Sequence, residues 1–401
     1  MNRLAQCGLT VLCIVLAAVY LPMAYDWLFV EPVAKTHLLY SPVLQQFVWT
    51  EKVAVPPAEA LGKGEDHHAE IIHRDEAGTY YSRVEFEKLL PFIYYKNMEL
   101  WGLLPLNIDG ERFDAETIKA RRRVMELTPR DILRRPVGLT VPPLLESAPG
   151  VARLVFPEDR YRLASGGLEF INADFNTVDD TLSQAFTSAL KDAGFVFPAR
   201  LTAGWPVLLK PFDAGHFLVD ATGAVFHLKR VEGTPVVVRT PIPPALQTRH
   251  IAVMESARRD YLGLLLAGDG SLHLLREDDY GLVPLPLPGY DPETMDFKLL
   301  LDPLHATAVY SDDTTIHGVA MDREFQVVRR YSHAMSRAEA GLAGQLGQVL
   351  FPVRLQWRTD PVPGFHLQLG NKWSLAVATV ALALLMLGML RMRRREQGRR
   401  G

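Results

Sequence analysis

Uninterrupted apolar runs stand near both ends of the chain. Residues 4–25 read "LAQCGLTVLCIVLAAVYLPMAY", and residues 373–390 read "WSLAVATVALALLMLGML", each without a charged side chain. A run of about 18 or more such residues predicts a transmembrane helix. Arg3 precedes the first run and six arginines lie within 391–401, and positive flanks favour the cytoplasmic side. The pattern predicts two spans, with both termini in the cytoplasm and the middle of the chain outside it.

The first run has two interpretations, a cleaved signal peptide or a retained anchor. It is long for the core of a signal peptide, and no clear small-x-small cleavage site follows it. We therefore favour the anchor. The expected location is the cytoplasmic (inner) membrane, with the lipid bilayer as a partner through two helices. Cys7 and Cys13 both fall within the first run, so the extracytoplasmic or periplasmic body has no disulfide.

Between the two runs the pattern alternates between strand-like and helix-like segments. Residues 31–64 contain "VAVPPAEALGKG", which is typical of a stalk or linker, and 65–371 then form the body. Ser82 with Glu85 predicts a capping box. The spacing predicts helices over 113–127, with Asp114 as N-cap, and over 177–194, started by Thr177 with Asp180.

A hairpin-like turn recurs within residues 165–330. It appears as "LVDATGAVFHLKR", "LLAGDGSLHLLRE" and "AVYSDDTTIHGVA", and Gly223, Gly270 and Thr314 hold equivalent places. A period in the forties is typical of a four-stranded propeller blade. We therefore predict a membrane-anchored α+β protein. Two transmembrane helices would flank a β-rich, propeller-like extracytoplasmic domain with a few packed helices. An irregular β-sheet domain carrying helices is the alternative.

The composition excludes two classes of protein, nucleic-acid-binding proteins and disordered chains. The chain has 401 residues, 48% of them hydrophobic, and a formal net charge of -3. A nucleic-acid-binding protein needs a clear basic excess to neutralise phosphates, so nucleic acid is excluded as a partner. The apolar content also excludes a disordered chain.

A histidine-acid cluster is the first candidate for chemistry. His67, His68, Glu70 and His73 offer nitrogen and oxygen ligands for zinc or another divalent metal. Their spacing is poor, because His68 and His73 would not share a helix face and on a strand would point to opposite sides. We keep the four as candidate metal ligands and favour a solvated turn.

The turn aspartates are a second candidate. Calcium binding is one interpretation, but no loop matches the EF-hand pattern, and turn formation explains these aspartates without a metal. They are Asp220, Asp269, Asp278, Asp279, Asp312 and Asp313. The sequence also lacks a Gly-x-Ser-x-Gly elbow, a Walker loop and a Gly-x-Gly-x-x-Gly fingerprint. We therefore assign no catalytic residue and no cofactor.

Two long segments resemble a known family. They are "LLPFIYYKNMELWGLLPLNIDGERFDAETIKARRRVMELTPRDI" and "LLKPFDAGHFLVDATGAVFHLKRVEGTPV". Both are similar to uncharacterised bacterial membrane proteins catalogued as domain of unknown function 4857. The resemblance implies both spans, the exported middle and an association with ABC-transporter ATPases and permeases. It implies no functional residue.

Two functions of different classes follow. The leading hypothesis is a non-enzymatic accessory protein, anchored at both ends, that binds a ligand or a protein as the partner of an ABC-type transporter permease or ATPase. The alternative is a membrane-anchored hydrolase or metal-dependent enzyme on the outer face of the cytoplasmic membrane.

Overall fold

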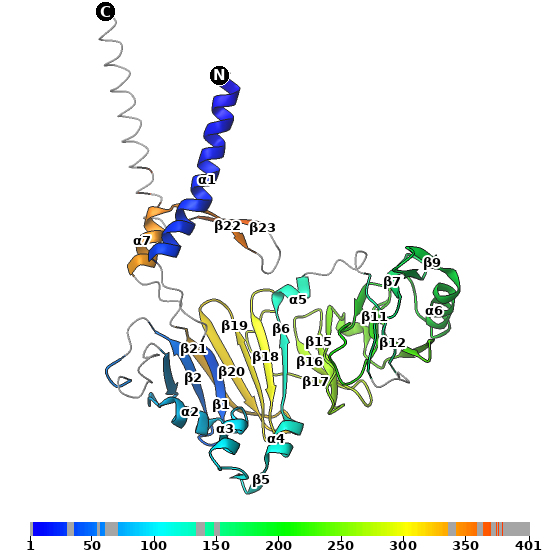
Figure 1. Cartoon of the computed structure of the whole chain (residues 1–401), viewed down its shortest axis with the longest axis horizontal. Coiled ribbons are helices and arrows are strands. Elements are labelled where there is room, and N and C mark those ends of the chain that lie inside the picture. Colours follow the sequence, from blue (N-terminus) through cyan, green and yellow to red (C-terminus); the bar gives the residue numbers. More distant parts are fainter. Residues whose placement is uncertain are drawn as a thin grey trace, which may run out of the picture.

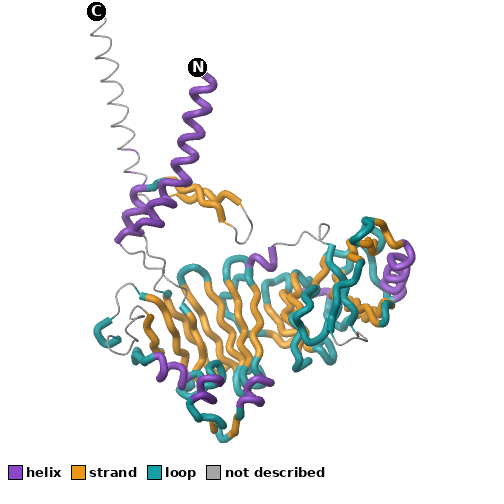
Figure 2. The backbone as a smooth tube through the Cα atoms, viewed as in Figure 1, coloured by secondary structure: helices purple, strands orange, loops and turns teal. Residues whose placement is uncertain are grey.

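The computed structural model describes residues 3–29, 36–53, 57–60, 71–133, 141–147, 153–335, 342–358 and 364–369, with residues 374, 376 and 379. Over these residues the protein consists mainly of antiparallel β-sheets, and a few helices pack on them (Figures 1 and 2).

A five-stranded antiparallel sheet occupies the centre of the molecule. Its order is β21-β20-β19-β18-β6, so β6 is an edge strand. One face carries a large apolar cluster in which Leu299 and Val319 join Leu264 and Leu274 of the neighbouring sheet. The strands are β6 (Arg123–Leu127), β18 (Asp296–Leu301), β19 (Ala306–Ser311), β20 (Thr315–Met321) and β21 (Val327–Ala334).

Two four-stranded meanders precede β18 in the chain and pack on each other. Leu265 and Leu275 of one share a buried cluster with Phe217 and Val225 of the other. The first meander contains β10 (Leu201–Ala203), β11 (His216–Val219), β12 (Val225–Val231) and β13 (Thr234–Arg239). The second contains β14 (His250–Val253), β15 (Tyr261–Leu266), β16 (Leu272–Arg276) and β17 (Leu282–Pro284), and the short helix η1 (Pro244–Leu246) joins the two.

A three-stranded sheet and helix α6 close the other side of the first meander. Phe170 and Phe186 share a cluster with Leu218 and Phe226. The expected helix over 177–194 is shorter, and Asp179 caps it by accepting the Leu182 N–H at 2.9 Å. Thr177 does not start the helix because it belongs to a strand. The elements are β7 (Asp159–Leu163), β8 (Leu168–Asn172), β9 (Thr177–Asp179) and α6 (Asp180–Asp192).

The structure differs from the expected stalk over residues 37–52. These residues form strands whose Leu38, Phe47 and Trp49 are buried against the central sheet. The apolar positions of this segment therefore serve the core. The three-stranded sheet contains β1 (His37–Ser41), β2 (Gln46–Lys52) and β3 (Ile71–Asp75). Beside it lie α2 (Arg83–Leu89), α3 (Tyr95–Leu100), β4 (Leu106–Ile108), β5 (Glu111–Phe113) and α4 (Ala115–Arg121).

The expected helix over 113–127 is correct only in its first half. Asp114 caps α4 by accepting the Thr117 N–H at 2.8 Å, as its position predicted. The helix ends at Arg121, Arg122 caps it, and Arg123–Leu127 form β6, which pairs with β18. Buried and exposed positions alternate along β6. Pairing with a distant strand has overridden the local helical preference. A short helix, α5 (Pro129–Leu133), follows β6.

The recurring turns are architectural, as we predicted. Each joins the second and third strands of a four-stranded meander: β11 to β12, β15 to β16 and β19 to β20. Gly223 and Gly270 have φ values of +89° and +86°, a region that favours glycine. The Asp220 carboxylate accepts the N–H groups of Thr222 and Ala224 at 2.8 and 2.9 Å.

The propeller-like arrangement is wrong. Over the described residues the meanders and their flanking sheets form an open series and do not close into a ring (Figure 1). The repeat supplies only three four-stranded units, and β6 adds to the edge of the last one. The β1–β3 sheet packs on that unit's second face, so its strands add a layer there.

The N-terminal helix contacts the chain near its other end. The Tyr25 hydroxyl donates to the Ala343 carbonyl at 2.9 Å, and Arg354 pairs with Asp26 at 3.0 Å. Tyr25 also meets Phe351 edge to face, with ring centroids 5.4 Å apart. The elements are α1 (Arg3–Phe29), α7 (Leu342–Leu350), β22 (Val353–Arg358) and β23 (Gly364–Leu369).

The two-span topology is wrong. In the part of the chain that the structure describes, no helix has both the length and the apolar character needed to cross a membrane. The contacts of α1 with α7 and β22 give part of its apolar run a packing role. The expected bilayer partner and the expected inner-membrane location both rested on these two spans, so they are corrected together with them. Most of 373–390 and all of 391–401 lie outside the described residues.

Candidate ligand-binding groove

A cavity of about 820 Å³ opens where three sheets meet, and we call it the β6–β14 groove. Its walls come from edge strands β6 and β14 and from the loop that follows edge strand β10. This volume falls within the range of small-molecule sites. The groove is lined by Arg123, Val124, Glu126, Asp131, Gly204, Trp205, Pro211, residues 250–255, Ser256 and Ala257.

A buried ionic cluster stands at the wall of this groove. The Lys210 ammonium donates to Asp213 Oδ1 at 2.7 Å, to Glu255 Oε1 at 2.6 Å and to the Trp205 carbonyl at 2.6 Å. The three charged side chains are 0%, 2% and 0% exposed, respectively. Lys210 and Asp213 come from the β10–β11 loop, whereas Glu255 follows β14. The cluster therefore joins two sheets at the groove.

The cluster has one carboxylate more than its single ammonium can balance. Asp213 Oδ2 accepts the Gly215 N–H at 2.9 Å, and Glu255 Oε1 also accepts the Ala214 N–H at 3.1 Å. Glu255 Oε2 is buried and has no hydrogen-bond partner among the described residues. A buried charged oxygen without a donor is costly. A ligand that brings a donor to this oxygen removes that cost.

Arg123 fixes the loop that carries Glu255. Its guanidinium donates to the Tyr261 carbonyl at 2.9 Å, to Asp260 Oδ1 at 3.0 Å and to the Met254 carbonyl. The Arg123 side chain is only 6% exposed, and burial lowers its pKa. It ties the β14–β15 loop to β6, so the groove walls are held together without a ligand.

Trp205 gives the groove an apolar, partly exposed edge. Its side chain is 38% exposed, and its ring centroid lies 6.0 Å from the Lys210 ammonium. Met254 and Pro211 add further apolar surface. The groove thus combines an apolar lining with a buried acidic group.

Of the four predicted metal ligands, the structure describes only His73. His67, His68 and Glu70 lie outside the described residues. His73 lies on β3, stacked on Phe86 with ring centroids 4.6 Å apart, and burial lowers its pKa. Across the described ranges, no group of three or more histidines, cysteines and acids could hold a metal ion. The metal site at 67–73 stays a prediction.

The turn aspartates are engaged by their own turns. Asp269 accepts the Ser271 N–H at 2.9 Å, and Asp312 accepts the Thr314 and Thr315 N–H groups at 2.6 and 2.7 Å. Turn formation, which we favoured for the six, therefore accounts for Asp269 and Asp312. The groove residues were missed by sequence reasoning. The one available signal was Lys210 and Asp213 in the otherwise apolar stretch "LLKPFDAGHF".

A family model decides where the chain belongs. The model described as "Domain of unknown function (DUF4857)" matches residues 37–321. The chain belongs to the DUF4857 family. The DUF4857 match begins at the first residue of β1, ends at the last residue of β20 and includes the whole groove. The family description names no transporter, so that association stays a prediction.

Other comparisons add little. No curated protein matches the DUF4857 chain. Among solved structures, the chain is similar to a Bacteroides fragilis protein described as a "Putative exported protein", at 9% identity and a TM-score of 0.17. The similarity covers 55% of this chain and 78% of that one.

Proposed function

We propose that this DUF4857 protein is a non-enzymatic binding protein. Its β6–β14 groove would hold a small ligand with a primary amine on an apolar body. The observation that carries this proposal is Glu255 Oε2, a buried carboxylate oxygen without a donor at the wall of a cavity of about 820 Å³.

The lining favours a cationic group. Asp131 adds negative charge at the groove, while Glu126 pairs with Lys298 at 2.7 Å and the guanidinium of Arg123 is committed to Asp260 and two carbonyls. An ammonium brought to Glu255 would turn the cluster of two carboxylates and one ammonium into a balanced set. Charge-assisted hydrogen bonds of this kind are about twice as strong as neutral ones. The apolar body would lie on Trp205, Pro211 and Met254.

A pair of matched probes tests this proposal. Phenethylamine and 2-phenylethanol share an aromatic body and differ in the charged group. Titration followed by tryptophan fluorescence should show saturable binding of the amine, at least about tenfold tighter than the alcohol. Trp205→Phe should remove most of the signal, although the chain has six tryptophans. Equal affinity for both probes would show that the ammonium of the ligand does not bind Glu255 Oε2.

A further inference from the structure

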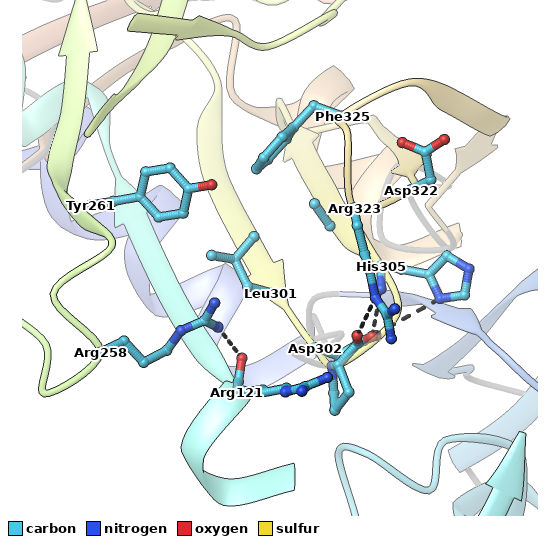
Figure 3. Close-up of a pocket in the computed structure, with 11 residues that line it drawn as sticks. Arg121, Arg258, Tyr261, Leu301, Asp302, His305, Asp322, Arg323 and Phe325 are labelled. Atoms are coloured by element: carbon cyan, nitrogen blue, oxygen red, sulfur yellow. Dashed lines mark hydrogen bonds and ion pairs between the residues drawn. The ribbon is translucent and has the colours of Figure 1, made fainter. Parts of the chain in front are cut away.

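A second cavity also borders the β14–β15 loop that Arg123 fixes. Its volume is about 270 Å³, and we call it the arginine pocket. Arg121 at the end of α4, Arg258 in the β14–β15 loop and Arg323 in the β20–β21 turn line it (Figure 3). Three cations from distant parts of the chain therefore meet in one small space.

The three arginines differ in how far they are engaged. Arg323 makes a two-pronged pair with Glu111 at 2.9 and 2.7 Å and donates from Nε to the Pro303 carbonyl at 2.9 Å. Arg258 pairs with Asp260 at 2.7 Å and donates to the Arg121 carbonyl. The Arg121 guanidinium makes no hydrogen bond or ion pair within the described residues. Its donors are available to a ligand.

A carboxyl group faces the same pocket. Asp302 Oδ1 accepts the Leu304 and His305 N–H groups at 2.8 and 2.7 Å, and the structure gives Oδ2 no hydrogen bond with the described residues. Burial raises the pKa of Asp302 to about 6. His305 Nδ1, 4.0 Å from Asp302 Oδ1, is also buried without a partner, and burial lowers the His305 pKa.

The far wall of the pocket is aromatic. Tyr261 and Phe325 meet edge to face with ring centroids 6.1 Å apart, and they lie across the pocket from Arg121 and Arg258 (Figure 3). The pocket therefore offers guanidinium donors, the carboxylates of Asp302 and Asp322, and an aromatic wall. A ligand that fits has an anionic head, a proton to donate and a small organic body.

We propose that the arginine pocket binds a small soluble phosphate monoester. Arg121 and Arg258 would hold its oxygens, and Asp302 would accept the proton that a phosphate monoanion still carries. Several guanidinium groups suit a tetrahedral oxyanion, whereas one guanidinium already satisfies a carboxylate. A phosphate group has a second pKa near 6, so it retains a proton at moderately acidic pH. Sulfate has no such proton and would meet the Asp302 carboxylate without a hydrogen bond.

Calorimetric titration of the full chain at pH 6 tests the pocket, with glycerol phosphate, inorganic phosphate and sulfate as probes. We expect saturable binding of both phosphate probes and at least about tenfold weaker binding of sulfate. Arg121→Gln should lower the affinity for glycerol phosphate by about tenfold or more. Arg112→Gln is the matched control, because Arg112 is exposed on β5. It should change the affinity for glycerol phosphate by less than about twofold.

Asp302→Asn tests the preference for phosphate over sulfate, which a mere loss of stability would leave unchanged. The amide can donate to either anion, so the preference for phosphate over sulfate should fall to near one. Equal affinities for the two anions in the wild type, or an unchanged preference in Asp302→Asn, would overturn the proposal. So would the absence of saturable phosphate binding. The groove and its Glu255 lie outside this pocket, so the amine-binding proposal stands or falls separately.

Discussion

Gly204 shows how tightly a single residue of the groove is constrained. A Cβ at this position would lie 2.0 Å from Cδ2 of His216, whose Nδ1 is 2.6 Å from the Tyr161 hydroxyl. His216 and Tyr161 are both buried, so neither can move aside cheaply.

Gly204→Ala should therefore destabilise the protein by about 2–4 kcal/mol through overpacking. Urea unfolding measures this free energy. Gly166→Ala is the control, because a Cβ there has no atom within 4 Å, and it should change stability by less than about 1 kcal/mol. Similar effects of the two substitutions would show that the space around Gly204 is not closed.

Asp302 makes stability depend on pH. Its pKa is about 6 in the folded protein, above the ordinary value of 3.8 for an aspartate, so the folded state binds the proton more tightly. The stabilisation from this group is present below pH 3.8 and is lost as the pH rises through about 6. Asp302→Asn removes the ionisation and should stabilise the protein at pH 8 by about 1–3 kcal/mol. Thermal unfolding of the wild type and the variant at pH 8 and pH 5 checks this. If Asp302→Asn stabilised the protein no more at pH 8 than at pH 5, the prediction would be contradicted.

At the scale of one element, the start of α2 was predictable from the sequence. Ser82 accepts the Glu85 N–H at 3.3 Å, and the Glu85 carboxylate accepts the Ser82 N–H at 2.9 Å, so the predicted capping box is confirmed. The helix buries Phe86 in the core, which couples its stability to that of the whole protein.

Ser82→Ala should cost about 1 kcal/mol because the capping oxygen is lost. Chemical denaturation with the curve fitted for the unfolding free energy measures it. Ser82→Thr retains the oxygen and should restore most of the difference. If the alanine variant were as stable as the wild type, the capping box would have no part in the stability of the fold.

The sequence also predicted the repeat turns, because their signals are local. Asp220 and Gly223 specify a turn within four residues, and the structure has that turn. The strand β6 could not be found in this way, since its pairing partner β18 lies far along the chain and decides its structure. The same limit hid the groove: Lys210 and Glu255 stand 45 residues apart, and only the packing of two meanders brings them together.

At the scale of the whole molecule, the fold is an open series of sheets whose edges create the cavities. The groove forms where β6, β14 and the segment after β10 converge, and residues of the β14–β15 loop line both the groove and the arginine pocket. Arg123 is buried at the wall of the groove and binds Asp260 of the same loop. We infer that the sheet junction, rather than any one sheet, is where this DUF4857 protein binds its ligands.

The measurement that tests this most directly is a calorimetric titration of phenethylamine into three proteins: the wild type, Glu255→Gln and Glu293→Gln. Glutamine keeps the shape of Glu255 and leaves Lys210 paired with Asp213, so the fold should persist, which circular dichroism checks. Glu293 is 59% exposed and pairs with Arg249 away from the groove, so it is the matched control. We predict that Glu255→Gln weakens binding by about tenfold or more and that Glu293→Gln changes it less than about twofold. Equal affinity in all three proteins, or no binding to the wild type, would contradict a ligand site built on Glu255.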